Sequence, residues 1–345
     1  MLSVVVGGQY GSEGKGKVAQ YLAVERSATA VVRVGGSNSG HTGFIGDDAV
    51  KVLRQLPTAA LLPDVLCVLG PGSYIDVDLL LREVDETALD PARLKIDPKA
   101  FVITAEDREM EERSGQVGEI GSTASGTGAS VLRRVARRRG SQTVADVASL
   151  RPFISETTSL LRPLLASGAR VIVEGTQGFG LSVLHGPHYP YATSRDTSAA
   201  GAVSEAGLSP MDVDEVALVL RTFPIRVGGN SGPLANEIDW ETIRHESGAS
   251  RELAEYTSVT GRLRRVARFD PELVRGAIAV NKPSLIVLNH IDYVDAECAM
   301  LGTLTDRARK FIRGVSDSIG APVDLVGLGP STIVDMTPRL ARSAV

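Results

Sequence analysis

Short runs of aliphatic and β-branched residues alternate with helix-like stretches along most of the chain, and this alternation constrains the fold more than any other feature. Each run ends in glycine or small polar residues, as buried strands do when they deliver loops to one edge of a sheet. The expected strands are Leu2–Val6, Ala30–Val34, Val65–Leu69, Phe101–Thr104, Arg170–Val173, Val216–Thr222 and Leu285–Leu288. The helix-like stretches are Val77–Val84, Thr143–Leu165, Pro271–Val280 and Thr305–Ile319. The pattern predicts an α/β fold with a mostly parallel central sheet flanked by helices.

Two irregular segments interrupt the alternation. Residues 105–140 are rich in charge, glycine and serine, and residues 224–268 are polar and contain several glycines. Irregular segments of this length inside a compact domain are usually active-site loops or mobile covers. We therefore expect one body over residues 1–345, with an inserted smaller lobe at 105–140 and a functional loop region at 224–268.

The composition excludes several classes of function. The formal net charge is −4, so no global basic field exists to hold a nucleic-acid backbone. The arginine-dense stretch at 133–139 lacks the interleaved aromatic residues that stack bases, which favours a solvated helix face. The two cysteines, Cys67 and Cys298, lie far apart without metal-ligand spacing, as expected in a reducing cytoplasm. No segment approaches a membrane span, and the first apolar run is too short for a signal peptide.

The expected first strand leads into a glycine-rich loop, Gly7–Lys17, followed by an expected helix. Glycines let backbone N–H groups converge on phosphate oxygens, the helix N-terminus adds a positive dipole end, and Lys15 and Lys17 neutralise charge. The loop resembles a P-loop but is one residue longer, and Gly16 stands where Ser or Thr contacts magnesium. It predicts a phosphate site; a glycine-rich turn without a ligand is the alternative.

The second expected strand leads into Gly35–Thr42, a loop of small residues with an amide, an imidazole and a hydroxyl. Such a loop suits a second wall of a phosphate site. His41 could donate a proton or a hydrogen bond to a migrating phosphoryl group, where stabilisation of developing charge dominates catalysis. A structural hydrogen bond is the alternative role for this histidine.

These loops resemble motifs of the adenylosuccinate synthetases. Gly7–Lys17 is similar to the family's GTQWGDEGKGK, and Gly36–Thr42 to its GGNNAGHT. The similarity continues in order through Gly121–Thr123, Val135–Arg138, Glu174–Gly178, Tyr189–Ser194, Thr222–Gly228, Thr260–Arg265 and Gly327–Pro330. The resemblance implies the P-loop-NTPase-like fold of that family, a homodimer, and small-molecule substrates: a purine nucleotide, L-aspartate and a nucleoside triphosphate.

In that family the triphosphate phosphorylates O6 of a 6-oxopurine nucleotide, and the aspartate amine then displaces the phosphate. The resemblance implies that donor and magnesium contact Gly11, Gly14, Lys15, Gly16, Lys17, Gly40, His41, Thr42, Asn289, Asp292, Gly327, Gly329 and Pro330. It implies that the purine nucleotide and aspartate contact Ser12, Asn38, Ser122, Thr123, Arg137, Gln177, Thr193, Arg226, Thr260, Gly261, Arg262 and Arg264.

Particular roles also follow from the resemblance. His41 acts as acid on the bridging oxygen, Gly40 offers a carbonyl to magnesium, and Arg137 reaches the nucleotide phosphate across the dimer interface. The 224–268 region becomes the aspartate-binding loop region, in which Arg262 and Arg264 supply the guanidinium forks that suit a carboxylate.

Ser12 departs from the family, which has an aspartate there that takes the purine N1 proton and helps to bind magnesium. A neutral serine cannot serve as that base, but it leaves room beside carbon 2 of the purine for an amino group. The chain therefore resembles a phage branch, the 2-amino-2′-deoxyadenylosuccinate synthases, which condense dGMP with aspartate for diaminopurine synthesis. Glu13 is the nearest retained carboxylate and our candidate for a catalytic and magnesium-binding role; ordering of the loop is its alternative role.

The donor site departs as well. The family's guanine-reading TKxD motif appears as Asn289-His290-Ile291-Asp292, which lacks the lysine, and the phage branch is associated with ATP or dATP. We expect an adenine nucleotide as donor with Mg²⁺, and GTP remains an alternative. Gln20 stands at an acceptor-side position where the family has aspartate.

Two other functions fit the sequence. One is an ordinary adenylosuccinate synthetase acting on IMP, which Ser12 opposes. The other is a catalytically silent nucleotide-binding regulator, which the retention of His41, Arg262 and Arg264 opposes. Aspartate-dependent phosphate release separates an enzyme from a regulator.

Overall fold

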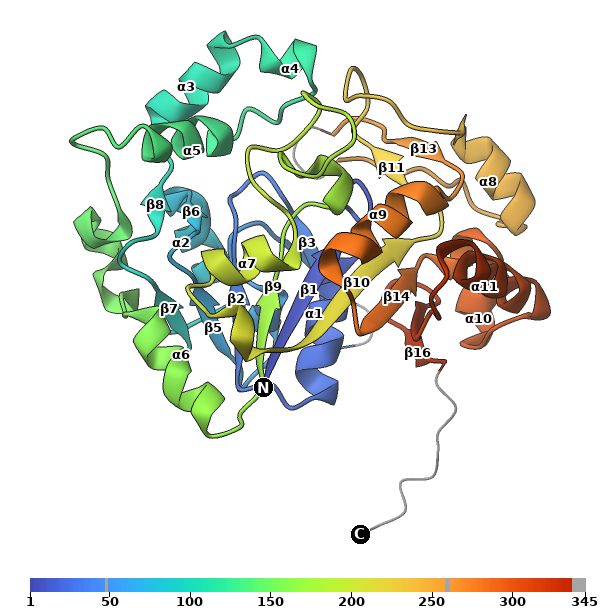
Figure 1. Ribbon diagram of the computed structural model, residues 1–345, viewed down its shortest axis with the longest axis horizontal. Helices are drawn as coiled ribbons and strands as arrows, with labels where there is room; N and C mark the ends of the chain where they lie inside the picture. The colour runs from blue at the N-terminus through green and yellow to red at the C-terminus, as the bar shows by residue number, and fades with distance from the viewer. Residues whose placement is uncertain (47–48, 258–260, 337–345) are drawn as a thin grey trace.

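The computed structural model describes residues 1–46, 49–257 and 261–336. Its centre is a nine-stranded sheet in the order β16-β15-β14-β10-β1-β9-β2-β5-β7, parallel except for β16 at one edge (Figure 1). The strands are β1 (Leu2–Gly7), β2 (Ala30–Arg33), β5 (Leu66–Leu69), β7 (Leu94–Ile96), β9 (Val171–Glu174), β10 (Val213–Arg221), β14 (Leu285–Asn289), β15 (Leu325–Gly327) and β16 (Ile333–Asp335). The expected fold class, a mostly parallel sheet flanked by helices, is confirmed.

Helices cover both faces of this sheet. Along β1, Leu2, Val4 and Val6 join one apolar cluster, and Val5 joins the other, because successive side chains of a strand point to opposite faces. The first cluster includes residues of α6 (Thr157–Ala166), α7 (Ala199–Glu205), α9 (Pro271–Asn281) and α11 (Asp306–Ile319). The second includes residues of α1 (Lys15–Glu25) and α2 (Val77–Glu86).

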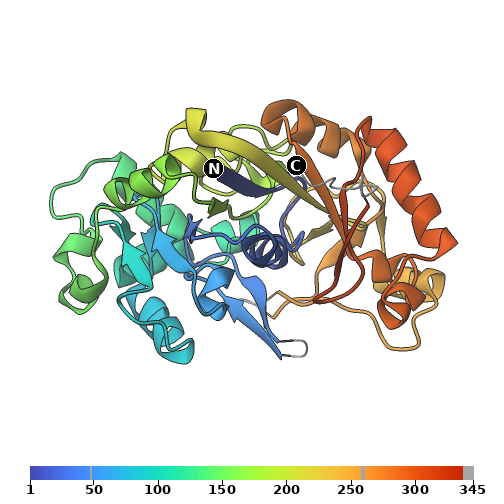
Figure 2. The ribbon, with the colours of Figure 1, turned by 90° about the horizontal axis from the view of Figure 1, so that it is seen from below.

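The remaining elements lie around this body. The segment 105–140 holds α3 (Ala105–Arg113), α4 (Gln116–Glu119) and α5 (Thr127–Val135), which gather beyond one end of the sheet (Figure 1). The hairpin of β3 (His41–Ile45) and β4 (Ala49–Leu53) projects from the body in Figure 2, where it is light blue. A small sheet in the 224–268 region has the strand order β11 (Ile225–Arg226), β13 (Arg265–Ala267), β12 (Glu237–Ile238), and α8 (Trp240–Ser247) lies between β12 and β13 in the sequence. Helix α10 is Glu297–Leu301.

Two expected elements are wrong in extent. Thr143–Leu165 is not one helix: 3₁₀ turns occupy 144–146 and 148–153, and α6 begins only at Thr157. Pro152 lies in the second turn and has no amide hydrogen for a helical ladder. The expected strand Phe101–Thr104 is only β8 (Phe101–Val102), which pairs with β6 (Tyr74–Ile75) outside the central sheet. Thr104 instead caps α3 by accepting a hydrogen bond from the Asp107 amide.

Candidate active site

A cavity of about 580 Å³ opens at the carboxyl ends of the central strands. Loops that follow β1, β2, β9, β14 and β15 contribute residues to its wall, among them Ser12, His41, Gln177, Asp292 and Gly329. In open α/β sheets, ligands bind at this edge because every parallel strand delivers its loop there.

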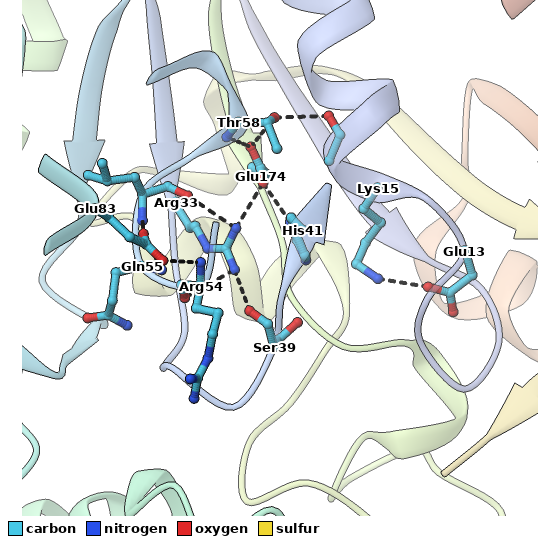
Figure 3. Close-up of polar contacts among 12 residues, drawn as sticks. Glu13, Lys15, Arg33, Ser39, His41, Arg54, Gln55, Thr58, Glu83 and Glu174 are labelled. Carbon is cyan, nitrogen blue, oxygen red and sulfur yellow. Dashed lines mark hydrogen bonds and ion pairs between the residues drawn. The ribbon is translucent and has the colours of Figure 1, made fainter. Parts of the chain in front are cut away.

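The phosphate loop is held from within by one buried carboxylate. Glu13 is fully buried, and its Oε1 accepts hydrogen bonds from the amides of Gln9 (3.1 Å) and Gly11 (2.8 Å). Its Oε2 lies 2.7 Å from Lys15 Nζ (Figure 3). Glu13 is not part of the cavity wall, whereas Lys15 is. This geometry favours the loop-ordering role for Glu13 over a catalytic or metal-binding one.

Close packing explains why Gly16 replaces the serine or threonine of an ordinary P-loop. A Cβ atom there would lie 2.7 Å from Thr58 Cγ2 and 2.8 Å from His41 Cβ. No side chain fits between α1 and the hairpin that carries His41. A magnesium-binding hydroxyl is therefore sterically excluded at this position.

His41 is buried and oriented by a second carboxylate. Its Nδ1 lies 2.5 Å from Glu174 Oε1 at the end of β9, and Glu174 also accepts from Arg33 Nη1 at 3.2 Å (Figure 3). Thr58 donates to the other oxygen of Glu174 through its amide and its hydroxyl, each at 3.0 Å. Although burial opposes ionisation, the contact with His41 and the charge of Arg33 hold the pKa of Glu174 below its ordinary value. The ionised Glu174 fixes the imidazole proton on Nδ1.

This arrangement leaves the other ring nitrogen of His41 at the cavity. Nε2 is buried and has no hydrogen-bond partner among the described residues. Burial, reinforced by Arg33, lowers the pKa of His41 to about 4. The imidazole is therefore neutral near pH 7 and becomes a proton donor at Nε2 only when an anion beside it favours the charged ring.

Lys17 connects the phosphate loop to the chain's last strands. Its Nζ donates to the carbonyls of Gly329 (2.6 Å) and Thr332 (2.9 Å), and burial lowers its pKa to about 8. Asp292 lies on the same wall, and burial raises the pKa of its carboxyl group to about 6. Asn289 donates from Nδ2 to the Glu13 carbonyl at 2.7 Å, which ties the end of β14 to the loop.

Ser12 occupies an exposed turn of the phosphate loop and lines the cavity. Its φ of 55° places it in the left-handed region, which few non-glycine residues adopt. The carbonyl oxygen of Ser12 accepts a hydrogen bond from Arg221 Nη1 at 3.1 Å. The backbone of position 12 is thus anchored, while its side chain is open to a ligand.

The arginines of the 224–268 region, where the resemblance implies aspartate binding, lie in two different environments. Arg264 lines the cavity and forms an ion pair with Glu255 at 2.9 Å. Gly261 and Arg262 are exposed and are not part of the cavity wall. Thr260 lies outside the described residues.

The structure brings together most of the residues that the sequence predicted for the site. The predicted residues on the cavity wall are Gly11, Ser12, Gly14, Lys15, Gly16, Lys17, Asn38, Gly40, His41, Thr42, Thr123, Gln177, Arg264, Asn289, Asp292, Gly329 and Pro330. Those that the structure describes away from the wall are Glu13, Ser122, Arg137, Thr193, Arg226, Gly261, Arg262 and Gly327.

Two of the residues away from the wall have clear environments. Arg226 is buried, stacks over Tyr10 with 4.2 Å between its guanidinium carbon and the ring centroid, and donates to the Ser231 carbonyl. Arg137 is exposed just after α5, with a left-handed φ of 52°. An exposed arginine is free to meet a second protein chain, the role the resemblance implies.

Sequence reasoning missed four side chains at this site: Glu174, Glu255, His290 and Tyr293. The last three line the cavity. Glu174 is not on the wall, and it orients His41 through the contact with Nδ1. Burial and the charge of Arg221 lower the pKa of His290 to about 3. Each lies in or beside a segment in which other residues were predicted to be part of the site. For Glu174, the available signal was a carboxylate at the end of an expected buried strand.

Within the described residues, no group of three or more His, Cys, Asp and Glu side chains is arranged to hold a metal ion. In the same part of the chain, no helix has the length and apolar character needed to cross a membrane.

Sequence comparison identifies relatives along nearly the whole chain. The sequence model of the family described as "Adenylosuccinate synthetase" matches residues 4–149 and 141–300. The chain is 35% identical to the adenylosuccinate synthetase of Thermococcus sibiricus, over 98% of this chain and 99% of that protein. It is also 35% identical to that of Methanocaldococcus jannaschii, over 95% of this chain and 94% of that protein.

Solved structures give the same result for the fold. The succinoaminodeoxyadenylate synthetase (PurZ) of cyanophage S-2L, solved with dGMP and with dATP as an energy donor, is 29% identical with a TM-score of 0.81, covering 98% of this chain and 96% of that one. A fully ligated adenylosuccinate synthetase from Plasmodium falciparum has a TM-score of 0.84 at 20% identity, covering 97% and 99% of the two chains.

Proposed function

The chain belongs to the adenylosuccinate synthetase family, and from that membership we propose that it joins L-aspartate to carbon 6 of dGMP. The γ-phosphoryl group of the donor passes to O6 of the purine as the nucleoside diphosphate leaves and N1 of the purine loses its proton. The aspartate amine then forms a bond to carbon 6, and the phosphate leaves with O6. The product is 2-amino-2′-deoxyadenylosuccinate, a precursor of diaminopurine nucleotides in a phage.

The side chain at position 12 carries the choice of dGMP. Ser12 lines the cavity on an exposed turn whose carbonyl is anchored by Arg221. A carboxylate at this place would crowd an exocyclic 2-amino group, whereas a serine hydroxyl is short, neutral and able to accept a hydrogen bond from it. The similarity to the cyanophage enzyme solved with dGMP supports the same acceptor.

His41 and the loop lysines perform the phosphoryl transfer in this proposal. Lys15 and Lys17 lie on the wall and neutralise the polyphosphate. The Nδ1–H of His41 stays with Glu174, so a proton on Nε2 makes the ring cationic, and the triphosphate stabilises that cation. His41 then donates to the bridging oxygen as the leaving group departs.

The cavity fits a magnesium ion that enters with the donor. No carboxylate cluster would hold it among the described residues, so phosphate oxygens and water would supply most of its coordination, with the carbonyl of Gly40 on the wall as a protein ligand. When bound, it neutralises phosphoryl charge. The buried position of Glu13 argues against including that residue among the ligands.

An adenine nucleotide, ATP or dATP, is the proposed donor. The segment Asn289–Asp292 lacks the lysine of the guanine-reading motif, and Asp292 lines the cavity. The cyanophage structure, solved with dATP as an energy donor, supports this choice. A homodimer is proposed from the family resemblance, with the exposed Arg137 reaching the nucleotide phosphate of the partner.

A substrate matrix tests the function. Purified protein is given IMP, GMP or dGMP with ATP, dATP or GTP, with and without aspartate, and phosphate release is measured. We expect the fastest aspartate-dependent release with dGMP and an adenine nucleotide. Faster turnover of IMP than of dGMP would refute the proposed acceptor, and exclusive use of GTP would refute the proposed donor. Absence of aspartate-dependent release with every acceptor would favour a silent nucleotide-binding regulator.

The variant Ser12→Asp provides the matched test of the steric argument. It should reduce dGMP turnover by about tenfold or more while IMP turnover is retained or increased, because a misfitting charged group costs roughly 1–3 kcal/mol. Unchanged dGMP turnover in Ser12→Asp would contradict the argument that Ser12 makes room for the 2-amino group of dGMP.

The second candidate function is an ordinary adenylosuccinate synthetase acting on IMP. It is favoured by the archaeal relatives at 35% identity, all of which carry that name. The same matrix decides between the two acceptors.

A further inference from the structure

Arg221 is a fully buried arginine at the end of β10 that touches both the phosphate loop and the aspartate-binding loop region. Its Nη1 donates to the Ser12 carbonyl at 3.1 Å and to Glu255 Oε2 at 3.2 Å, and its Nη2 donates to Glu255 Oε1 at 2.6 Å. Its backbone is fixed by Gln9, whose side chain accepts from the Arg221 amide at 2.9 Å and donates to its carbonyl at 3.2 Å. One side chain thus spans two segments that are distant in sequence.

Glu255 continues this chain of contacts to Arg264. The two residues face each other at the base of a loop closed by the bridge between Tyr256 and Leu263. The Arg264 amide donates to the Glu255 carbonyl at 2.8 Å, and Arg264 Nη1 donates to Glu255 Oε2 at 2.9 Å. Glu255 Oε2 is therefore shared by the guanidinium groups of Arg221 and Arg264.

The charges of this cluster do not cancel. Although burial opposes ionisation, Arg221 and His290 hold the pKa of Glu255 well below its ordinary range, so it stays anionic at working pH. Two guanidinium groups then surround one carboxylate, and one positive charge is left over. Because Arg264 lies on the cavity wall, that excess charge is available to an anionic ligand.

We propose that Arg221 and Glu255 are positioning residues: they hold the guanidinium of Arg264 at the cavity wall to receive a carboxylate of aspartate, and they link its placement to the backbone of Ser12. The assignment of aspartate to Arg264 rests on the proposed function. Fixing the guanidinium before binding lowers the entropy cost of capturing the substrate. Because Arg221 contacts both Glu255 and the Ser12 carbonyl, it also connects the aspartate subsite to the residue that faces the purine.

A purely structural ion pair is the competing explanation, and Glu255→Gln separates the two. The amide keeps the shape but loses the charge that holds both arginines. The matched control is Glu237→Gln, which removes a bidentate pair with Arg265, the residue next to Arg264 in sequence, with contacts of 2.8 and 2.6 Å. Glu237 is not part of the cavity wall.

Kinetics is measured with whichever acceptor the wild-type protein converts fastest. Glu255→Gln should raise the KM for aspartate by about tenfold or more, because the Arg264 guanidinium loses the charged acceptor that holds it at the wall. The KM values for both nucleotides should change by less than about threefold, and Glu237→Gln should change none of the three. An unchanged aspartate KM in folded Glu255→Gln, or an equal rise in all three KM values with a lower Tm, would overturn the proposal.

The chain's single tryptophan gives a readout that needs no activity. Trp240 Nε1 donates to the Arg264 carbonyl at 2.8 Å, so its fluorescence reports on the base of the loop. Loosening that base in ligand-free Glu255→Gln should shift Trp240 emission to longer wavelength, and Glu237→Gln should not. An unshifted spectrum, or the same shift in both variants, would count against the proposal. If the wild type releases no phosphate with any acceptor, the proposed function fails, while the spectra still decide whether Glu255 holds Arg264.

Discussion

The phosphate loop and the 224–268 region, where we propose that aspartate binds, are held in place in different ways. In residues 7–17, Glu13 holds the backbone through contacts only a few residues apart in sequence, and Arg221 and Asn289 add hydrogen bonds from distant strands. In residues 224–268, the cavity-lining Arg264 is held by Glu255 and, through it, by the distant Arg221. Arg262, two residues before Arg264, is exposed.

The difference matches the ligands that we propose for the two halves of the site. The phosphate half is the loop of residues 7–17, and the aspartate half is the 224–268 region with Arg264. Phosphate is a compact anion that converging backbone amides and lysines can bind on a rigid loop. A dicarboxylic amino acid needs forked cations at defined distances, and here long side chains must be fixed by further side chains. The fold of the phosphate loop is therefore set mainly by neighbouring residues, whereas the placement of Arg264 depends on side chains that only the complete fold brings together.

Weakening the contacts inside the phosphate loop should have the largest effect on stability. Glu13→Gln leaves the loop amides with an acceptor but removes the partner of the buried Lys15 cation. An unpaired buried charge of this kind costs about 3–5 kcal/mol, so the free energy of unfolding in urea should fall by that amount and activity should fall with it.

The exposed Glu252 of the other region provides the control. Glu252→Gln should change the unfolding free energy by less than about 0.5 kcal/mol. A Glu13→Gln protein of wild-type stability but without activity would contradict the loop-ordering role and restore Glu13 as a catalytic candidate.

The aspartate half is tested by comparing its two arginines. Arg264→Ala should lower kcat/KM for aspartate by about 100-fold, as expected for the loss of a bidentate contact to a carboxylate, without affecting the KM of either nucleotide. Arg262→Ala should cost less than about tenfold if Arg262 stays exposed in the complex. Equal losses in both variants would mean that the loop closes over the substrate and brings Arg262 into the site. Steady-state kinetics with varied aspartate measures both.

Local patterns were sufficient to predict most of the fold and the place of the 7–17 loop at the cavity wall. The runs of β-branched residues predicted the main strands to within a few residues of their observed ends. Buried parallel strands are apolar along nearly their whole length, so the sequence alone reveals them. The glycines and lysines of residues 7–17 predicted a cavity wall because a phosphate loop is formed by consecutive residues.

What escaped prediction depends on pairing across the fold. Nothing near Glu174 in sequence indicates that it orients His41, which lies 133 residues away. Glu255 pairs with Arg221 across 34 residues, and no local pattern distinguishes it from a solvated carboxylate. The segment 143–165 has helix-like spacing, but Pro152 cannot donate to a helical hydrogen-bond ladder, and the chain forms 3₁₀ turns there before α6.

The smallest expected effect is the pH dependence of activity due to Lys17. It tests whether the Lys17 cation binds phosphate or only donates a hydrogen bond to the Gly329 carbonyl. Burial lowers its pKa from 10.5 to about 8, so the free enzyme loses this cation as the pH rises above about 8. If Lys17 binds phosphate, kcat/KM for the donor should then fall about tenfold per pH unit, since this ratio reports ionisations of the free enzyme. The stability contribution has the opposite sign: between about 8 and 10.5 the unfolded chain binds more protons at this lysine, so its contribution to stability rises with pH. Lys17→Arg, which keeps its charge, should lower kcat/KM but abolish the alkaline decline. A decline of the same steepness in that variant would assign it to another group and leave Lys17 a structural tether.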